Sequence, residues 1–147
     1  SIGDGAFTYC RALLSVTIPN SVTSIGRQAF EECSALLSVT IPNSVTSISN
    51  AAFFECSALD NIYPQGIDAL SLTLDTIGDD VYSGTTIGNF SLPDTLTSIG
   101  NDALRGSNID TLYVSQILLD RLSINMNVIL IIFFEKLFYT FSKKNEI

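Results

Sequence analysis

The chain has 147 residues, 46% of them hydrophobic, so it is long and apolar enough to bury the core of one domain. Its 15 acidic and 7 basic residues give a net charge of −8, which excludes a nucleic-acid partner because phosphate binding needs clustered Lys and Arg. The sequence has no His, and no Lys precedes Lys136. Histidine dyads, histidine metal sites and a catalytic lysine in the main body are therefore excluded, and we predict no enzyme, no metal and no cofactor.

The chain begins inside a pattern that recurs, so we expect a fragment or a trimmed chain. Residues 15–26 read SVTIPNSVTSIG and residues 38–49 read SVTIPNSVTSIS, an offset of 23. Three further columns keep the same offset: Phe7, Phe30 and Phe53; Cys10, Cys33 and Cys56; Leu13, Leu36 and Leu59. Apolar positions that hold one spacing over so many residues indicate a solenoid whose successive coils stack on one another.

The first element predicted in each coil is a strand. The apolar letters of LLSVTI (residues 36–41) have the spacing of a leucine-rich repeat strand, and Thr40 alternates with them, so one strand face is buried. Pro42 ends this strand because proline donates no N–H to a sheet. Val45 and Ile48 then predict a second short strand or extended arm.

The rest of the coil is predicted to turn back. A glycine follows the last isoleucine of the repeat at Gly26, Gly78 and Gly100, which suggests a turn with positive φ, although Ser49 occupies the same place in one coil. The apolar residues of AFEECSAL (29–36) have helical spacing. We therefore expect one short helical turn on the outer side of each coil.

The second half of the chain repeats less regularly. Residues 77–92 and 99–114 align at an offset of 22, whereas Ile48 and Ile77 are 29 residues apart. The longer spacing indicates an insertion of about six residues somewhere in 63–76, which would interrupt the edge of the sheet. We count about five coils over residues 1–114.

The repeat as a whole is similar to a known family. IPNSVTSIGRQAFEECSAL (residues 18–36) resembles the BspA-type leucine-rich repeat, whose 23-residue motif is I-P-x-S-V-T-x-I-G-x-x-A-F-x-x-C-x-x-L. The resemblance covers residues 1–114 and implies an α/β leucine-rich repeat solenoid, with a parallel β-sheet on the concave side and short helical turns outside. It also implies adhesion or protein–protein recognition, often on cell or secreted surfaces. The family offers no shared catalytic residues to transfer to this chain.

The outward strand positions are the candidate contact surface on the concave side. They carry hydroxyls, one amide and two tyrosines: Ser15, Thr17, Ser38, Thr40, Asn61, Tyr63, Thr73, Thr111 and Tyr113. Solenoids bind partners on such faces, and Tyr is favoured at interfaces. We predict a non-catalytic module that binds a protein or peptide. Two alternatives stay open: Ser and Thr merely suit exposed strands, or the coils are a structural spacer in a larger surface protein.

Two other groups of residues could carry chemistry. The three cysteines are expected to be buried apolar fillers, and a disulfide between neighbouring coils is the alternative because a coil spacing of about 4.8 Å falls within disulfide reach. Asp75, Asp79 and Asp80 are expected to form a solvated turn, with a Ca²⁺ site as the alternative.

The composition changes after Val114, and residues 115–147 form an atypical hydrophobic tail. SQILLDRL (115–122) is predicted to be helical and to cap the end of the solenoid. The apolar run VILIIFF (128–134) is much shorter than the ~20 residues of a membrane span, and Glu135 and Lys136 follow it. A capping or interfacial helix is the main interpretation, and a membrane-spanning helix or a tail that is not native are the alternatives.

Overall fold

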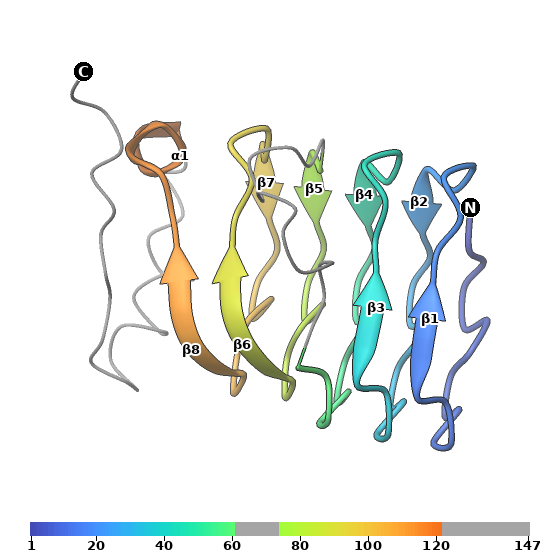
Figure 1. Cartoon of the computed structure of the whole chain (residues 1–147). Coiled ribbons are helices and arrows are strands. Elements are labelled where there is room, and N and C mark those ends of the chain that lie inside the picture. Colours follow the sequence, from blue (N-terminus) through green and yellow to red (C-terminus); the bar gives the residue numbers. More distant parts are fainter. Residues whose placement is uncertain (61–73, 122–147) are drawn as a thin grey trace.

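The computed structural model describes residues 1–60 and 74–121, which wind as stacked coils. The elements in chain order are β1 (Ser15–Thr17), β2 (Ser24–Ile25), β3 (Ser38–Thr40), β4 (Ser47–Ile48), β5 (Thr76–Ile77), β6 (Thr86–Ser91), β7 (Ser98–Ile99), β8 (Asn108–Tyr113) and α1 (Gln116–Arg121). Figure 1 shows two layers, with β1, β3, β6 and β8 in front of β2, β4, β5 and β7. The coils of β1 and β2, of β3 and β4, and of β6 and β7 each contribute one strand to each layer, as a solenoid requires.

The strands pair in the register that the repeat predicts. All pairings are parallel, because every coil runs in the same direction as the one before it. Ser15 faces Ser38 at the offset of 23, Ser47 faces Thr76 across the insertion, and Ile87 faces Ile109 at the offset of 22. The predicted parallel leucine-rich repeat solenoid is thus confirmed.

Hydrogen bonds on either side of the insertion define its limits. The N–H of Asp60 donates to Leu37 O at 3.1 Å, which keeps the offset of 23. The N–H of Asp75 donates to Thr46 O at 2.8 Å, which already has the offset of 29. The extra residues therefore lie within 61–73, and residues 74–76, the end of the predicted segment, belong to a regular coil. The layer of short strands is continuous across this point because β4 pairs directly with β5.

The outer side of each coil is a series of turns in which every second N–H points to the next coil. The N–H groups of Gln28, Phe30 and Glu32 donate to Asn50 O, Ala52 O and Phe54 O at 3.0, 2.8 and 2.8 Å. Gln28 and Glu32 have positive φ, 56° and 52°, which interrupts helical geometry before a second helical bond can form. The short helical turns expected here are therefore single hydrogen-bonded turns.

The glycines that follow the isoleucine column serve another purpose than the one predicted. The expected positive φ at Gly26, Gly78 and Gly100 is wrong, because the positive-φ glycines of the described chain are Gly5, Gly84 and Gly106. A Cβ at Gly100 would instead lie 2.3 Å from Asp79 N and 2.4 Å from Gly78 C. Glycine is needed because the preceding coil approaches too closely for any side chain.

A ladder of Asp and Asn side chains explains this close approach. The Oδ1 atoms of Asp4, Asn50 and Asp79 accept the N–H groups of Arg27, Asp79 and Asn101 at 2.8, 3.2 and 2.7 Å. The same oxygens lie only 2.5–2.6 Å from where a Cβ would stand on the glycine of the next coil. Arg27 interrupts this ladder, and the coil after it carries Ser49 instead of glycine. The exception therefore follows from the loss of the carboxylate or amide one coil earlier.

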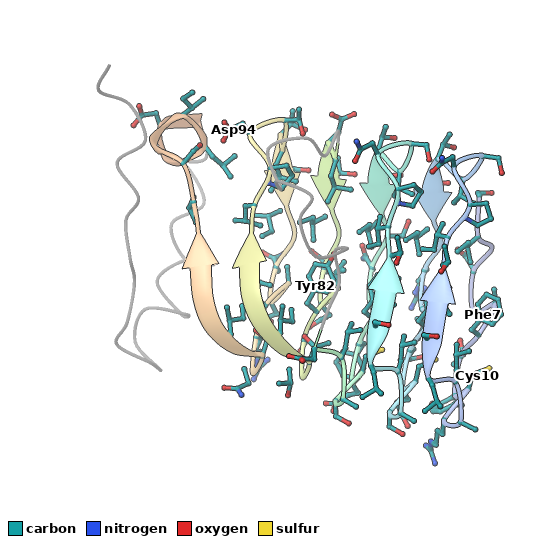
Figure 2. The ribbon with its side chains drawn as sticks, viewed as in Figure 1. Phe7, Cys10, Tyr82 and Asp94 are labelled. Atoms are coloured by element: carbon teal, nitrogen blue, oxygen red, sulfur yellow. The ribbon has the colours of Figure 1, made fainter. Side chains whose placement is uncertain are left out.

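The core between the layers consists of columns of like side chains. Phe7 stacks on Phe30 at 5.1 Å, Phe30 on Phe53 at 5.2 Å and Phe53 on Tyr82 at 5.8 Å between ring centroids, with the planes 8° apart or less. Phe30, Phe53 and Tyr82 are fully buried, and Phe7 is 38% exposed because it ends the stack. Figure 2 shows Phe7 at the N-terminal end of the coils. The predicted columns are confirmed.

The regular coils end where serine replaces proline. Ser115 stands 22 residues after Pro93, so it occupies the place at which proline starts a turn in the coil before it. Its Oγ accepts the N–H of Leu118 at 3.1 Å and so caps the first turn of α1, while its hydroxyl donates to Asp94, labelled beside α1 in Figure 2. Leu118 is buried against the last coil, and the helix falls within the predicted 115–122. The run 128–134 lies outside the described residues.

Candidate recognition surfaces

The outward side of the long strands β1, β3, β6 and β8 is the first candidate, and we call it the long-strand face. Ser15 and Thr17 of β1 are exposed, and Ser38 and Thr40 of β3 are half-buried. The parallel register places Ser15 opposite Ser38 and Thr17 opposite Thr40, whereas the intervening Val39 is buried in the core. The structure therefore brings these four predicted contact residues together as two short rows of hydroxyls.

The other predicted contact residues are placed only in part. Asn61, Tyr63 and Thr73 lie outside the described residues. The backbone of Thr111 and Tyr113 lies on β8, where these residues pair with Asn89 and Ser91 of β6. β6 and β8 form a two-stranded sheet of their own, which Figure 1 shows in the same layer as β1 and β3.

The long-strand face is wider in the later coils. β6 and β8 have six residues each, whereas β1 and β3 have three. The cause is one missing residue: proline follows Cys33 after nine positions, but it follows the equivalent Thr85 after only eight. In the earlier coil the N–H of Leu36 donates to Cys33 O at 3.0 Å and closes a turn before β3 begins. The later coil lacks this turn, so β6 starts directly after Thr85.

A second candidate surface, which sequence analysis missed, lies on the layer of short strands. It is a shallow depression of about 350 Å³ that crosses β4, β5 and β7, and we call it the short-strand groove. Its lining is Ser47, Ile48, Ser49, Asn50, Thr76, Ile77, Gly78, Asp79, Ser98, Ile99 and Gly100. The available signal was the recurrence of Ser, Thr and Gly on both sides of the isoleucine column, because small side chains at stacked positions leave a channel.

The cysteine column forms hydrogen bonds rather than disulfides. All three thiols are free; Cys33 and Cys56 are buried, as expected of fillers, whereas Cys10 is exposed because it belongs to the first coil. The Sγ–H groups of Cys33 and Cys56 donate to Phe7 O and Phe30 O of the preceding coil at 3.1 and 3.0 Å. Burial, with a smaller contribution from neighbouring Cys33, raises the pKa of Cys56 to about 12. These buried thiols therefore stay neutral and are not nucleophiles.

Of the acidic residues near the insertion, Asp79 is engaged in the ladder, whereas Asp75 is exposed and Asp80 is half-buried at a positive φ. Oδ1 of Asp79 accepts the N–H of Asn101, and Oδ2 accepts an N–H of the Asn50 side chain at 3.3 Å. Within residues 1–60 and 74–121, no group of three His, Cys, Asp or Glu side chains could hold a metal ion. In the same part of the chain, no helix is both long and apolar enough to cross a membrane.

The repeats now identify the family. The model of the BspA type leucine rich repeat region matches six copies over residues 1–123. The chain belongs to this family. Because the match reaches residue 123, it includes α1 as well as the coils. No relative of significant similarity is found among curated proteins.

Solved leucine-rich repeat proteins share this fold. A leucine rich repeat protein of T. pallidum is 28% identical with a TM-score of 0.65, and the match covers 77% of this chain and 51% of that protein. A leucine-rich repeat protein from Eubacterium ventriosum is 27% identical with a TM-score of 0.57, and the match covers 71% of this chain and 26% of that protein. The chain therefore spans about half or less of these two proteins. The family and the fold are those of a repeat-based protein-interaction module.

Proposed function

We propose that this chain is a non-catalytic recognition module that binds a protein or peptide across the long-strand face. The observation that carries the proposal is the registered pairing of exposed hydroxyl positions on β1 with those on β3. The pairing holds these hydroxyls at a fixed spacing above a packed core, so they present hydrogen-bond donors and acceptors without a large loss of conformational entropy on binding.

Three features support recognition rather than catalysis. The buried thiols are neutral, the chain has no histidine, and no lysine lies within the coils. The six-residue strands β6 and β8 also give a partner a broader contact area than the turns elsewhere. Adhesion at a cell or secreted surface is the setting in which we place this module, by analogy with its family.

The test adds charge to one face at a time. Peptides selected against the immobilised chain from a random library would be titrated in solution with T17R/T40R, which adds two cations to the long-strand face. The matched control S34R/S57R adds the same charge at two exposed turn positions that are also one coil apart. We expect the face variant to weaken binding about tenfold or more, equivalent to about 1.4 kcal/mol, and the control to change it less than about twofold.

The two tyrosines that the repeat predicts on the same face supply a second measurement. Replacing Tyr63 and Tyr113 together by alanine is expected to weaken a partner that contacts this face. Full affinity in this variant and in T17R/T40R would show that the partner does not contact the long-strand face. A chain that selects no binder above background would instead support the alternative role, a structural spacer in a larger surface protein.

A further inference from the structure

The short-strand groove lies on the layer opposite the surface of the proposed function. It runs along the axis of the solenoid and crosses three successive coils, at β4, β5 and β7. Neighbouring parallel strands are about 4.8 Å apart, so the three strands span roughly 10 Å. That length matches about three residues of an extended peptide laid along the axis.

Within the floor of the groove, neighbouring coils bond each other's backbone from β4 to β5 and from β5 to β7. The N–H of Gly78 donates to Ile48 O at 2.9 Å, and that of Gly100 donates to Ile77 O at 2.8 Å, so the coils satisfy each other. One wall carries the hydroxyls of Ser47, Thr76 and Ser98. The other carries the amide of Asn50 and the carboxylate of Asp79. Over this bonded floor, a guest is therefore held mainly by side chains.

The charge around the groove is negative. The three coil segments around it, residues 47–50, 75–80 and 98–102, contain four acidic side chains: Asp75, Asp79, Asp80 and Asp102. They contain no basic side chain, and Arg105, just beyond them, pairs with Asp102 at 3.6 Å. Asp79 lines the groove, and the exposed Asp75 immediately precedes Thr76 of β5. Carboxylates accept but do not donate hydrogen bonds, so this wall favours a cationic guest rich in N–H donors.

We propose that the short-strand groove binds an extended peptide segment that carries Lys or Arg between small residues. Its cationic side chains pair with Asp75 and Asp79. Its small residues lie over the floor at Gly78 and Gly100, because the depression is too shallow to hold a large side chain. This site is independent of the long-strand face, because a different layer forms it.

The probe for this site is a fluorescein-labelled peptide, acetyl-Gly-Lys-Gly-Lys-Gly-Lys-amide, titrated by fluorescence anisotropy at about 0.15 M salt, where long-range attraction is largely screened. A peptide with Glu in place of Lys should not bind. The variant D75N/D79N should weaken binding about fivefold or more; Asn at position 79 keeps the ladder, because Asn50 already serves in the same role. The matched control E31Q/E55Q removes the same charge from the turn side and should change binding less than twofold.

A steric variant and a direct map separate the groove from net charge. S98Y fills the groove without changing charge and is expected to weaken binding at least as much as D75N/D79N. In the unmodified chain, NMR amide signals of residues 76–79 and 98–100 should shift on titration, and those of β1 and β3 should not. Equal weakening by both charge pairs, or shifts spread over the whole acidic surface, would overturn the proposal and leave only attraction to net charge. T17R/T40R should leave peptide binding and these NMR shifts unchanged, so this proposal can fail while the proposed function stands.

Discussion

The coils before residue 61 and those after residue 73 share one architecture but differ in how the position after the aromatic column is bonded. In the earlier coils the thiol of Cys56 donates to Phe30 O of the preceding coil at 3.0 Å. In the later coils the hydroxyl of Thr85 donates to Tyr82 O at 2.6 Å, three residues earlier in its own coil. The side chain thus links two coils in one region and closes a single turn in the other.

This difference shows which interactions the stacking depends on. The backbone ladder is the same in both regions: the N–H of Phe30 donates to Ala52 O at 2.8 Å, and that of Tyr82 donates to Ala103 O at 2.8 Å. Backbone bonds and apolar columns therefore maintain the stack, while the side chain at the cysteine position varies. The later coils can accordingly lose one residue there and extend their long strands, at no cost to the neighbouring layer.

The largest effect is expected from the aromatic column, which is continuous in the earlier coils. Phe53 is fully buried between the rings of Phe30 and Tyr82, so F53A should lower the free energy of unfolding by about 3–5 kcal/mol. Urea unfolding followed by circular dichroism measures this change. The control L37A removes a side chain that is 53% exposed and should cost less than about 0.5 kcal/mol. Similar costs for the two variants would contradict the column as the main source of stability.

The second-largest effect is expected at the position after the isoleucine column, which is glycine in the later coils and Ser49 in an earlier one. G100A places a Cβ 2.3 Å from the backbone nitrogen of Asp79, which has no flexible end that could move, so we expect a loss of about 2–4 kcal/mol. S49A, at the equivalent place in the earlier coil, removes only a hydroxyl and should cost less than about 1 kcal/mol. Thermal and urea unfolding of both variants provide the comparison. A mild G100A would mean that the later coils can separate more easily than their hydrogen bonds indicate.

The thiols make the stability of the earlier coils sensitive to alkaline pH. The pKa of Cys56 is raised from 9.0 to about 12 in the folded state, so its contribution is complete below pH 9 and is lost as the pH rises from 9 toward 12. At pH of about 10 the expected loss is about 1.4 kcal/mol. Urea unfolding of the wild type and of C56A, once below pH 9 and once at pH of about 10, measures this loss. The variant should lose less stability on going to high pH, and parallel losses would show that the thiol does not contribute.

The smallest effect concerns the exposed ion pair of the first coils. Arg11 lies 2.6 Å from Glu32, but its side chain is 63% exposed, so R11A should change stability by less than about 0.5 kcal/mol. R105A tests the pair that Arg105 forms with Asp102, three residues earlier in the same coil, and should have an equally small effect. A loss above about 1 kcal/mol in either variant, measured by urea unfolding, would indicate that the charged turns contribute to stacking.

Much of this fold was predictable because a repeat constrains many residues at once. The parallel register, the end of the strands at proline and the burial of the phenylalanine column all follow from the offset of 23 and the alternation of apolar residues. The role of Gly26, Gly78 and Gly100 was not predictable in this way. Local rules associate glycine with positive φ, whereas these residues respond to the Asp or Asn side chain of the preceding coil.

Of the two candidate surfaces, one was predictable from the sequence and the other was not. Alternation within SVT places the hydroxyls of Ser38 and Thr40 outside from the sequence alone. The short-strand groove could not be read from one coil, since its walls come from side chains in three coils and its depth from the absence of side chains at Gly78 and Gly100.

The amino-acid sequence by itself determined the family, the number of residues per coil and the residues that face the core. Each of these depends on the regular spacing of apolar residues, which is visible in the sequence. Only the tertiary structure decided which contacts join one coil to the next: the Asp and Asn ladder, the thiol bonds to the preceding carbonyl and the groove across β4, β5 and β7. These features depend on the distance between neighbouring coils, and that distance is set by the backbone hydrogen bonds that form when the coils stack.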